Sequence, residues 1–155
     1  MSHSIHDTRK DYQKGAIDVS ALPKDTIVLL QQWLKDAQNT EGQDYNAMSL
    51  ATLGDEGIVS NRIVLLRDID EGNLRFFTNY TSRKGKSIDK NPSVIALFFW
   101  PTLKRQIRNI GRAQRSAADI GDTYVNTRPR ASQLGAWASN QGAAGEEDAL
   151  LKRLE

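Results

Sequence analysis

The chain has 155 residues, a length that fits one domain of ordinary size. Hydrophobic residues make up 39% and charged residues 26%, as in a soluble globular protein, and no apolar run approaches the roughly 20 residues of a membrane helix. Cysteine is absent, which excludes a disulfide framework and a thiolate nucleophile, and the two histidines, His3 and His6, lie in the polar leader. We therefore expect a cytoplasmic protein with no metal site, in which a cofactor supplies any difficult chemistry.

The net charge of +2 conceals an uneven distribution along the chain. Residues 62–130 hold 14 Lys and Arg against 6 Asp and Glu, whereas the flanks hold 7 against 13. A basic middle favours an anionic ligand, either nucleic acid or a phosphorylated small molecule. A solvated basic surface is the plainer alternative.

The first predicted element is a helix that begins at Asp25 or Thr26 and runs to about Gln38. Its apolar residues recur at helical spacing on one face: Ile27, Leu30, Trp33, Leu34 and Ala37. We interpret Trp33 as a core anchor rather than a ligand contact.

Short strands joined by tight turns follow, which favours antiparallel hairpins. The predicted strands are Ala47–Leu53, Ser60–Arg67, Leu74–Thr78, Ser93–Trp100 and Arg105–Arg115. Helices are predicted from Thr81 or Ser82 to about Asn91, from Ser116 to about Thr127, over Ser132–Ala138 and over Glu146–Glu155. The sum is a mainly β, α+β fold: a small antiparallel barrel with peripheral helices.

The strand Arg62-Ile63-Val64-Leu65-Leu66-Arg67 carries an arginine at each end. Side chains alternate along a strand, so Arg62, Val64 and Leu66 share one face and the other three residues share the opposite face. Both arginines can serve neighbouring pockets, although an ordinary edge strand with flanking charges has the same pattern.

Two cations, Arg83 and Lys84, open the helix that follows Thr81 and Ser82. Free N–H groups at a helix start attract phosphate, and cations are unfavourable there unless an anion compensates them. The pattern predicts a bound phosphate or, equally, a simple cap with a solvated basic turn.

A third cluster surrounds the helix break at Pro129. Tyr124 and Arg128 lie four residues apart on one helix face, and Ser132 begins the next helix. Their phenol, guanidinium and hydroxyl groups can converge on one anion, although a capped corner explains the same residues. Gln106, on the long strand with Arg108, Ile110 and Arg112, suits a heterocycle or a plain polar rim.

Taken together, the chain resembles the pyridoxamine 5′-phosphate oxidase family from Arg9 to about Gln141. Five segments in order carry the resemblance: RKDYQKG, RIVLLR, FFTNYTSRKGKSIDKNP, LFFWPTLKRQIR and YVNTRPRASQLGAWASNQ. The last segment is the most diagnostic. The resemblance implies an FMN-binding split barrel and a homodimer with flavin mononucleotide (FMN) at the subunit interface. It also implies oxidation of pyridoxamine or pyridoxine 5′-phosphate to pyridoxal 5′-phosphate, with O2 converted to H2O2.

The resemblance also assigns residues to two ligands. Those implied to contact the flavin are Arg62, Ile63, Val64, Leu65, Leu66, Arg67, Phe77, Thr78, Arg83, Lys84, Gln106 and Gln141. Those implied to contact the substrate are Arg9, Tyr12, Arg67, Tyr124, Arg128 and Ser132. No residue is assigned as a catalytic acid or base.

Three positions depart from the family pattern: Arg67 replaces a lysine, Gly142 a serine, and Asn109 an apolar residue. Family members also continue past the point that matches Glu155, into strands that carry a flavin-contacting tryptophan and an Arg-x-His segment. We expect a flexible leader over residues 1–20, the split-barrel domain over 21–145 and a helix over 146–155. The alternatives are a non-catalytic protein that binds FMN or pyridoxal phosphate and another flavin reductase on the same barrel. A nucleic-acid-binding barrel is a distant option that the 7% aromatic content does not favour.

Overall fold

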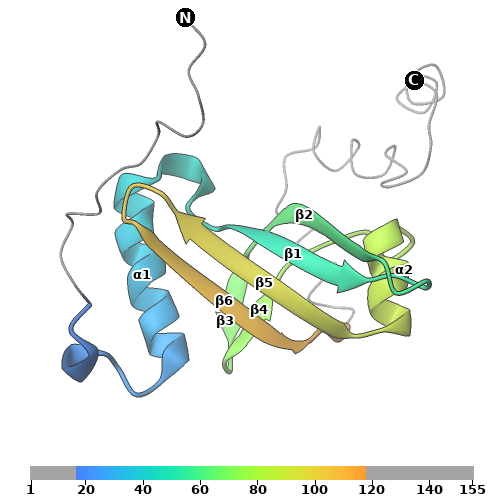
Figure 1. Cartoon of the computed structure of the whole chain (residues 1–155), viewed down its shortest axis with the longest axis horizontal. Coiled ribbons are helices and arrows are strands. Elements are labelled where there is room, and N and C mark those ends of the chain that lie inside the picture. The colour runs from blue at the N-terminus through green and yellow to red at the C-terminus, as the bar shows by residue number, and fades with distance from the viewer. Residues whose placement is uncertain (1–16, 118–155) are drawn as a thin grey trace, which may run out of the picture. The chain divides into compact units, whose positions relative to one another are not determined.

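A computed structural model of the chain describes residues 17–117, and Figure 1 shows its course. These residues form two compact units. The first unit comprises residues 17–46 and Phe99–Ile107, and the second comprises Ala47–Phe98 and 108–117. In chain order the elements are η2 (Val19–Ala21), α1 (Thr26–Thr40), η3 (Gly42–Asp44), β1 (Ala47–Leu53), β2 (Val59–Leu65), β3 (Asp68–Asp70), β4 (Asn73–Arg75), α2 (Arg83–Lys90), β5 (Ser93–Trp100) and β6 (Arg105–Arg112).

Helix α1 begins where the sequence predicts it. The side chain of Asp25 accepts a hydrogen bond from the Ile27 N–H at 2.8 Å, which satisfies one of the free donors of the first turn. The helix continues to Thr40, two residues past the expected end. Both the cap and the helix are therefore confirmed.

The predicted apolar face of α1 supplies the core of the first unit. Leu30, Leu34 and Ala37 are buried, and the ring of Trp33 meets that of Trp100 edge to face at a centroid distance of 6.5 Å. The indole Nε1 of Trp100 donates to the Tyr45 carbonyl at 2.8 Å, so this buried donor has a partner. Trp33 is a packing residue, as expected.

Four antiparallel strands form the main sheet, in the order β2-β1-β5-β6 (Figure 1). β1 pairs with β2 along its whole length, from Ala47 opposite Leu65 to Leu53 opposite Val59. It also pairs with β5, from Ser49 opposite Leu97 to Thr52 opposite Val94. The expected hairpins are confirmed, and β1 and β5 have the bounds that the sequence predicts.

One face of β1, β2 and β5 is buried and the other is open among the described residues. The buried face carries Met48 and Leu50 of β1, Val64 of β2, and Ala96 and Phe98 of β5. On the opposite face Ile63 is 65% and Ile95 39% exposed. Arg62 lies opposite Leu50 in the register and so belongs to the buried face, where it is the one charged residue of these three strands.

The expected strand Ser60–Arg67 begins and ends earlier, at Val59 and Leu65. The chain leaves the main sheet there, and β3 pairs with β4 in a separate two-stranded sheet that the sequence did not predict as two strands. The turn between β3 and β4 has positive φ at Glu71 and Gly72.

The expected strand Leu74–Thr78 is likewise shortened to Asn73–Arg75. Its pairing partner β3 has three residues, so residues beyond Arg75 find no ladder on that side. Strand β6 ends at Arg112 rather than Arg115, and the next N–H, of Ala113, donates to the carbonyl of Pro92, the residue before β5.

The helices predicted after Ser116, over Ser132–Ala138 and over Glu146–Glu155 lie outside the described residues. Within residues 17–117, no helix has the length and apolar character needed to cross a membrane.

Candidate functional site

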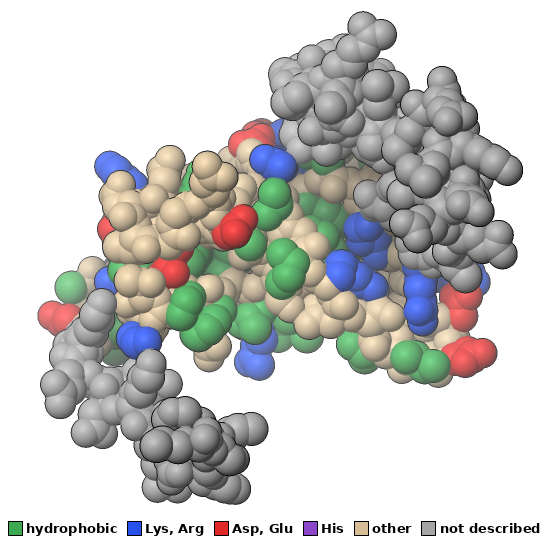
Figure 2. Space-filling view, turned by 90° about the horizontal axis from the view of Figure 1, so that it is seen from above, with side chains coloured by type: hydrophobic (Ala, Val, Ile, Leu, Met, Phe, Trp, Pro, Cys, Tyr) green, Lys and Arg blue, Asp and Glu red, His purple; other side chains and the backbone are tan. Residues whose placement is uncertain are grey.

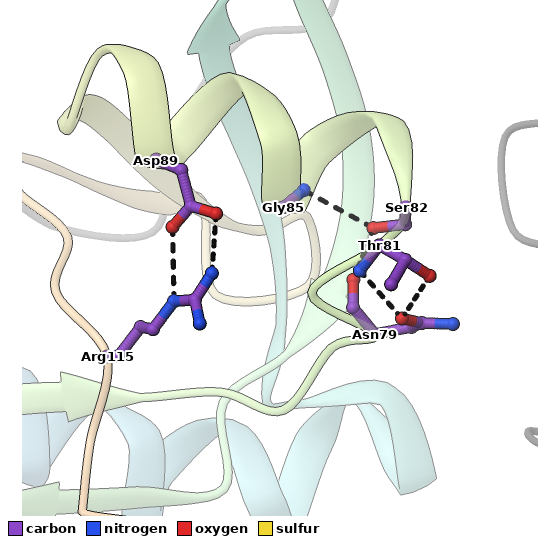
Figure 3. A network of polar contacts seen from close by, with 6 residues as sticks. All are labelled: Asn79, Thr81, Ser82, Gly85, Asp89 and Arg115. Carbon is purple, nitrogen blue, oxygen red and sulfur yellow. Dashed lines mark hydrogen bonds and ion pairs between the residues drawn. The ribbon is translucent and has the colours of Figure 1, made fainter.

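The start of α2 is built by short-range hydrogen bonds from polar residues (Figure 3). The Ser82 hydroxyl accepts from the Gly85 N–H at 3.3 Å and donates to the Asn79 carbonyl at 2.6 Å. The Asn79 carboxamide oxygen accepts from the N–H and the hydroxyl of Thr81, both at 2.8 Å. Of the two predicted caps, Thr81 and Ser82, the structure has Ser82, and these hydrogen bonds hold the loop before it.

Gly85 lets this loop approach the helix very closely. A Cβ on Gly85 would lie 2.3 Å from the carbonyl oxygen of Tyr80 and 2.8 Å from its Cα. Both are backbone atoms, so no side-chain rotation relieves the contact. The first turn of α2 is therefore in close backbone contact with Tyr80.

Three cations gather at this end of the helix. Arg83 and Lys84 occupy its first turn, which contains no acidic residue. Burial lowers the pKa of Lys84, and the positive charge of Arg62 lowers it further. The pKa of Arg62 is lowered by burial and then by Arg83. Arg62 on β2 thus lies within electrostatic reach of Lys84 and of Arg83 at the start of α2.

Arg62 is anchored to the neighbouring strand. Its Nη1 donates to the Leu50 carbonyl at 3.1 Å and to the Thr52 hydroxyl at 2.9 Å, and Thr52 is only 2% exposed. Within residues 17–117, no carboxylate forms an ion pair with Arg62 or Arg83. Arg62 is half-buried and Arg83 is exposed, and a bound anion would offset the repulsion between these two cations.

A buried hydroxyl without a partner lies just before this helix. Residues 76–79 link β4 to α2 without regular structure. There the Oγ1 of Thr78 is buried and has no hydrogen-bond partner among the described residues, while the neighbouring Phe77 is half-buried. Buried polar groups are nearly always satisfied, so this hydroxyl is available to a ligand or an assembly contact.

The alternation predicted along β2 is confirmed. Val64 and Leu66 are buried beside Arg62, whereas Ile63 and Arg67 are exposed and Leu65 is half-buried. The two arginines therefore face opposite sides. The backbone N–H of Arg67 donates to the Arg75 carbonyl at 2.8 Å, which holds the chain where it leaves the sheet.

Of the remaining predicted ligand contacts, one lies on β6 and the others lie outside the described residues. Gln106 is exposed on β6, within the first unit. On the same strand the Nδ2 of Asn109 is buried and finds no partner in the described part of the chain. The predicted contacts that lie outside the described residues are Arg9, Tyr12, Tyr124, Arg128, Ser132 and Gln141.

The sequence alone did not indicate three residues that shape the site. Thr52 supports Arg62, and Gly85 allows the close loop. Arg115 forms an ion pair with Asp89 on α2. Glycine in the first turn of a short helix was a usable signal for Gly85, because glycine disfavours helices unless packing requires it. Nothing local marks Thr52 or Arg115, whose partners are distant in sequence.

Lys and Arg side chains gather on part of the surface drawn in Figure 2, with apolar side chains between them. This arrangement agrees with the basic middle of the sequence. Within residues 17–117 no group of three or more His, Cys, Asp or Glu side chains is placed to hold a metal ion. The described part of the site is suited to bind a phosphate group rather than a cation.

Comparison with known proteins identifies relatives over most of the chain. The family model described as pyridoxamine 5′-phosphate oxidase matches residues 34–154. A pyridoxine/pyridoxamine 5′-phosphate oxidase of Chromohalobacter salexigens is 44% identical over 141 residues, which are 91% of this chain and 66% of the relative. The enzyme of the same name from Pseudomonas putida is 42% identical over 161 residues, or 100% of this chain and 75% of the relative. The chain thus spans about two thirds to three quarters of the length of these relatives.

Solved structures agree in fold. PhzG from Burkholderia lata, in complex with tetrahydrophenazine-1-carboxylic acid, matches with a TM-score of 0.81 at 27% identity, over 90% of this chain and 72% of its own. A pyridoxamine 5′-phosphate oxidase-related, FMN-binding protein from Nostoc punctiforme matches with a TM-score of 0.64 at 20% identity, over 80% of this chain and 69% of its own. The expected split-barrel fold class is confirmed.

Proposed function

The chain belongs to the pyridoxamine 5′-phosphate oxidase family, and from that premise we propose that it binds FMN and oxidises pyridoxamine or pyridoxine 5′-phosphate to pyridoxal 5′-phosphate. With the alcohol, O2 takes up two electrons and two protons to give H2O2. With the amine, water also enters and ammonia leaves. The observation that carries the proposal is the cluster of Arg62, Arg83 and Lys84 at the start of α2.

The described residues fit a flavin phosphate. Arg62, Arg83 and Lys84 would neutralise the phosphate, and the positive end of the α2 helix dipole would favour it. Thr78 has a buried hydroxyl that lacks a partner and would donate to or accept from the ligand. Its neighbour Phe77 would contact the flavin through its ring.

The remaining contacts of the flavin and substrate are proposed from the resemblance. Flavin would lie along β2 at Ile63, Val64, Leu65, Leu66 and Arg67, with Gln106 and Gln141 at its heterocycle. Substrate phosphate would be held by Arg67, Tyr124, Arg128 and Ser132, and the leader residues Arg9 and Tyr12 would cover the substrate. When bound, FMN supplies the two-electron acceptor that takes a hydride from the substrate and is reoxidised by O2. The chain itself binds and orients the two ligands.

We further propose a homodimer, in the cytoplasm. Its support is the open face of the main sheet, where Val59 is 66% and Ile63 65% exposed beside the half-exposed Ile95. Exposed apolar patches mark interaction surfaces. Light scattering should give twice the mass of the 155-residue chain, and a monomer at micromolar concentration would contradict the dimer.

The test of the flavin proposal is titration with FMN and with riboflavin, which lacks the phosphate. We expect FMN to bind with an altered flavin absorption band and Lys84→Met to weaken it about tenfold or more, as loss of a charge-assisted hydrogen bond requires. Lys86→Met is the matched control, because Lys86 is exposed on the same helix and its N–H already bonds to the Ser82 carbonyl. A wild-type protein that binds no FMN would refute the proposal.

Peroxide release on adding pyridoxamine 5′-phosphate to the FMN-loaded protein tests the oxidase activity. A second candidate is an oxidase with another substrate, favoured by the match to PhzG and by Arg67, whose planar fork differs from a lysine ammonium. Flavin binding without peroxide release from pyridoxamine or pyridoxine 5′-phosphate would favour this candidate or a non-catalytic flavin-binding protein. Peroxide release with a cyclic substrate such as tetrahydrophenazine-1-carboxylic acid would then separate the two.

A further inference from the structure

The chain that leaves β6 is attached to α2 at several points. The Ala113 N–H donates to the Pro92 carbonyl at 2.8 Å, just beyond the end of the helix. The Arg115 guanidinium donates to both carboxylate oxygens of Asp89, from Nε at 3.1 Å and from Nη2 at 2.6 Å (Figure 3). The same guanidinium carbon lies 4.5 Å from the centroid of the Tyr80 ring. One side chain thus connects the last turn of α2 to the loop before its first turn.

Tyr80 transmits this connection to the start of the helix. Its carbonyl and Cα leave no space for a Cβ at Gly85, so its backbone is in contact with the first turn. Next to it, Asn79 and Ser82 hold the loop by the hydrogen bonds described above. A shift of Tyr80 therefore shifts the turn that carries Arg83 and Lys84.

The small stabilisation that an exposed ion pair provides indicates the role of the contact between Arg115 and Asp89. The side chains of Arg115 and Asp89 are 57% and 42% exposed, and pairs of this kind add little to stability. Asp89 also lies in the last turn of α2, where the helix dipole disfavours a carboxylate. The contact is bidentate and stacked on an aromatic ring, a geometry that arginine provides and lysine does not. The main effect of this contact is therefore to orient Tyr80 relative to α2.

We propose that Arg115 is a positioning residue, which pairs with Asp89 and covers Tyr80 and thereby sets the geometry of the phosphate site at Arg83 and Lys84. The proposal rests on the proposed function only for the identity of the anion, the phosphate of FMN. Arg115 acts through α2 and does not itself contact the ligand.

The test compares Arg115→Gln with Lys90→Gln. The control removes another exposed ion pair of the same helix, that of Lys90 with Asp55, which does not touch the loop at Tyr80. Both variants, in the full chain, are titrated with FMN and with riboflavin. We expect Arg115→Gln to weaken FMN about threefold to tenfold while riboflavin stays within about twofold, since misplaced groups lose affinity only for the part they position. Lys90→Gln should change neither.

Several outcomes would overturn the inference. Unchanged FMN affinity in Arg115→Gln would do so, and so would an equal loss for FMN and riboflavin, which indicates general destabilisation. Arg115→Lys should recover only part of the FMN affinity, because it keeps the charge without the bidentate stack. If Arg115→Gln fails to fold, Tyr80→Leu, which leaves the ion pair intact, should give the same selective loss of FMN affinity. A wild-type protein that binds no FMN refutes the proposed function, whereas wild-type binding equalled by Arg115→Gln refutes this inference alone.

Discussion

The substitution Gly85→Ala tests the close contact at the start of α2. The added Cβ would lie 2.3 Å from the Tyr80 carbonyl oxygen, so that oxygen must move about 1 Å to reach the 3.4 Å of an ordinary contact. Overpacking of this kind costs about 1–3 kcal/mol. Alanine recovers up to about 1 kcal/mol of that through its higher helix propensity. We expect a net loss of about 1–2 kcal/mol, which lowers Tm by roughly 2–8 °C in a chain of this size.

Thermal unfolding followed by circular dichroism measures this loss, and Gly111→Ala is the matched control. Gly111 lies on β6, and nothing is within 4 Å of the Cβ that alanine would add there. Alanine at that position should be neutral or stabilising by about 0.5 kcal/mol. If Gly85→Ala raised Tm, as replacement of an unconstrained helical glycine would, the argument for a coupled loop and helix would be refuted. FMN affinity should fall in Gly85→Ala and stay unchanged in Gly111→Ala.

Three further predictions concern the charged groups and their supports. Thr52→Val removes the hydroxyl that accepts from Arg62 and should cost about 1–2 kcal/mol in urea unfolding, whereas Thr52→Ser should retain most of the stability. The Arg115 hydrogen bond lowers the pKa of Asp89, so the ion pair stabilises the fold above about pH 3.8 and this stabilisation is lost as pH falls through the lower folded pKa. The difference in unfolding free energy between wild type and Asp89→Asn should therefore shrink on acidification. A constant difference would contradict this. Burial and Arg62 lower the pKa of Lys84 from 10.5, so the free protein gains stability as pH rises through the lowered pKa. A bound phosphate would raise this pKa again. Calorimetry in two buffers should therefore detect proton uptake on FMN binding at alkaline pH, and none with Lys84→Met.

Local patterns in the sequence were sufficient for the two α-helix starts and for two of the strands. Side-chain alternation and apolar runs gave the bounds of β1 and β5, and the caps at Asp25 and Ser82 gave the starts of both helices. Alternation also placed Arg62 on the buried face of β2 and Ile63 on its exposed face. These features depend on neighbours within a few residues, so one sequence contains the information for them.

The tertiary structure decided which cations meet and what holds them. Arg62 finds its acceptors on β1, ten and twelve residues earlier, and Arg115 finds Asp89 twenty-six residues earlier. Strand β4 ends at Arg75 because its partner β3 is short, a limit that the residues of β4 do not carry. Strand pairing and ion pairs between distant segments depend on the register of the whole sheet, whereas periodicity reports only which face a residue occupies. The sequence by itself therefore determined most of the elements and the residue types of the proposed phosphate site, and the packing of β1, β2 and α2 determined that Arg62 lies near the start of α2.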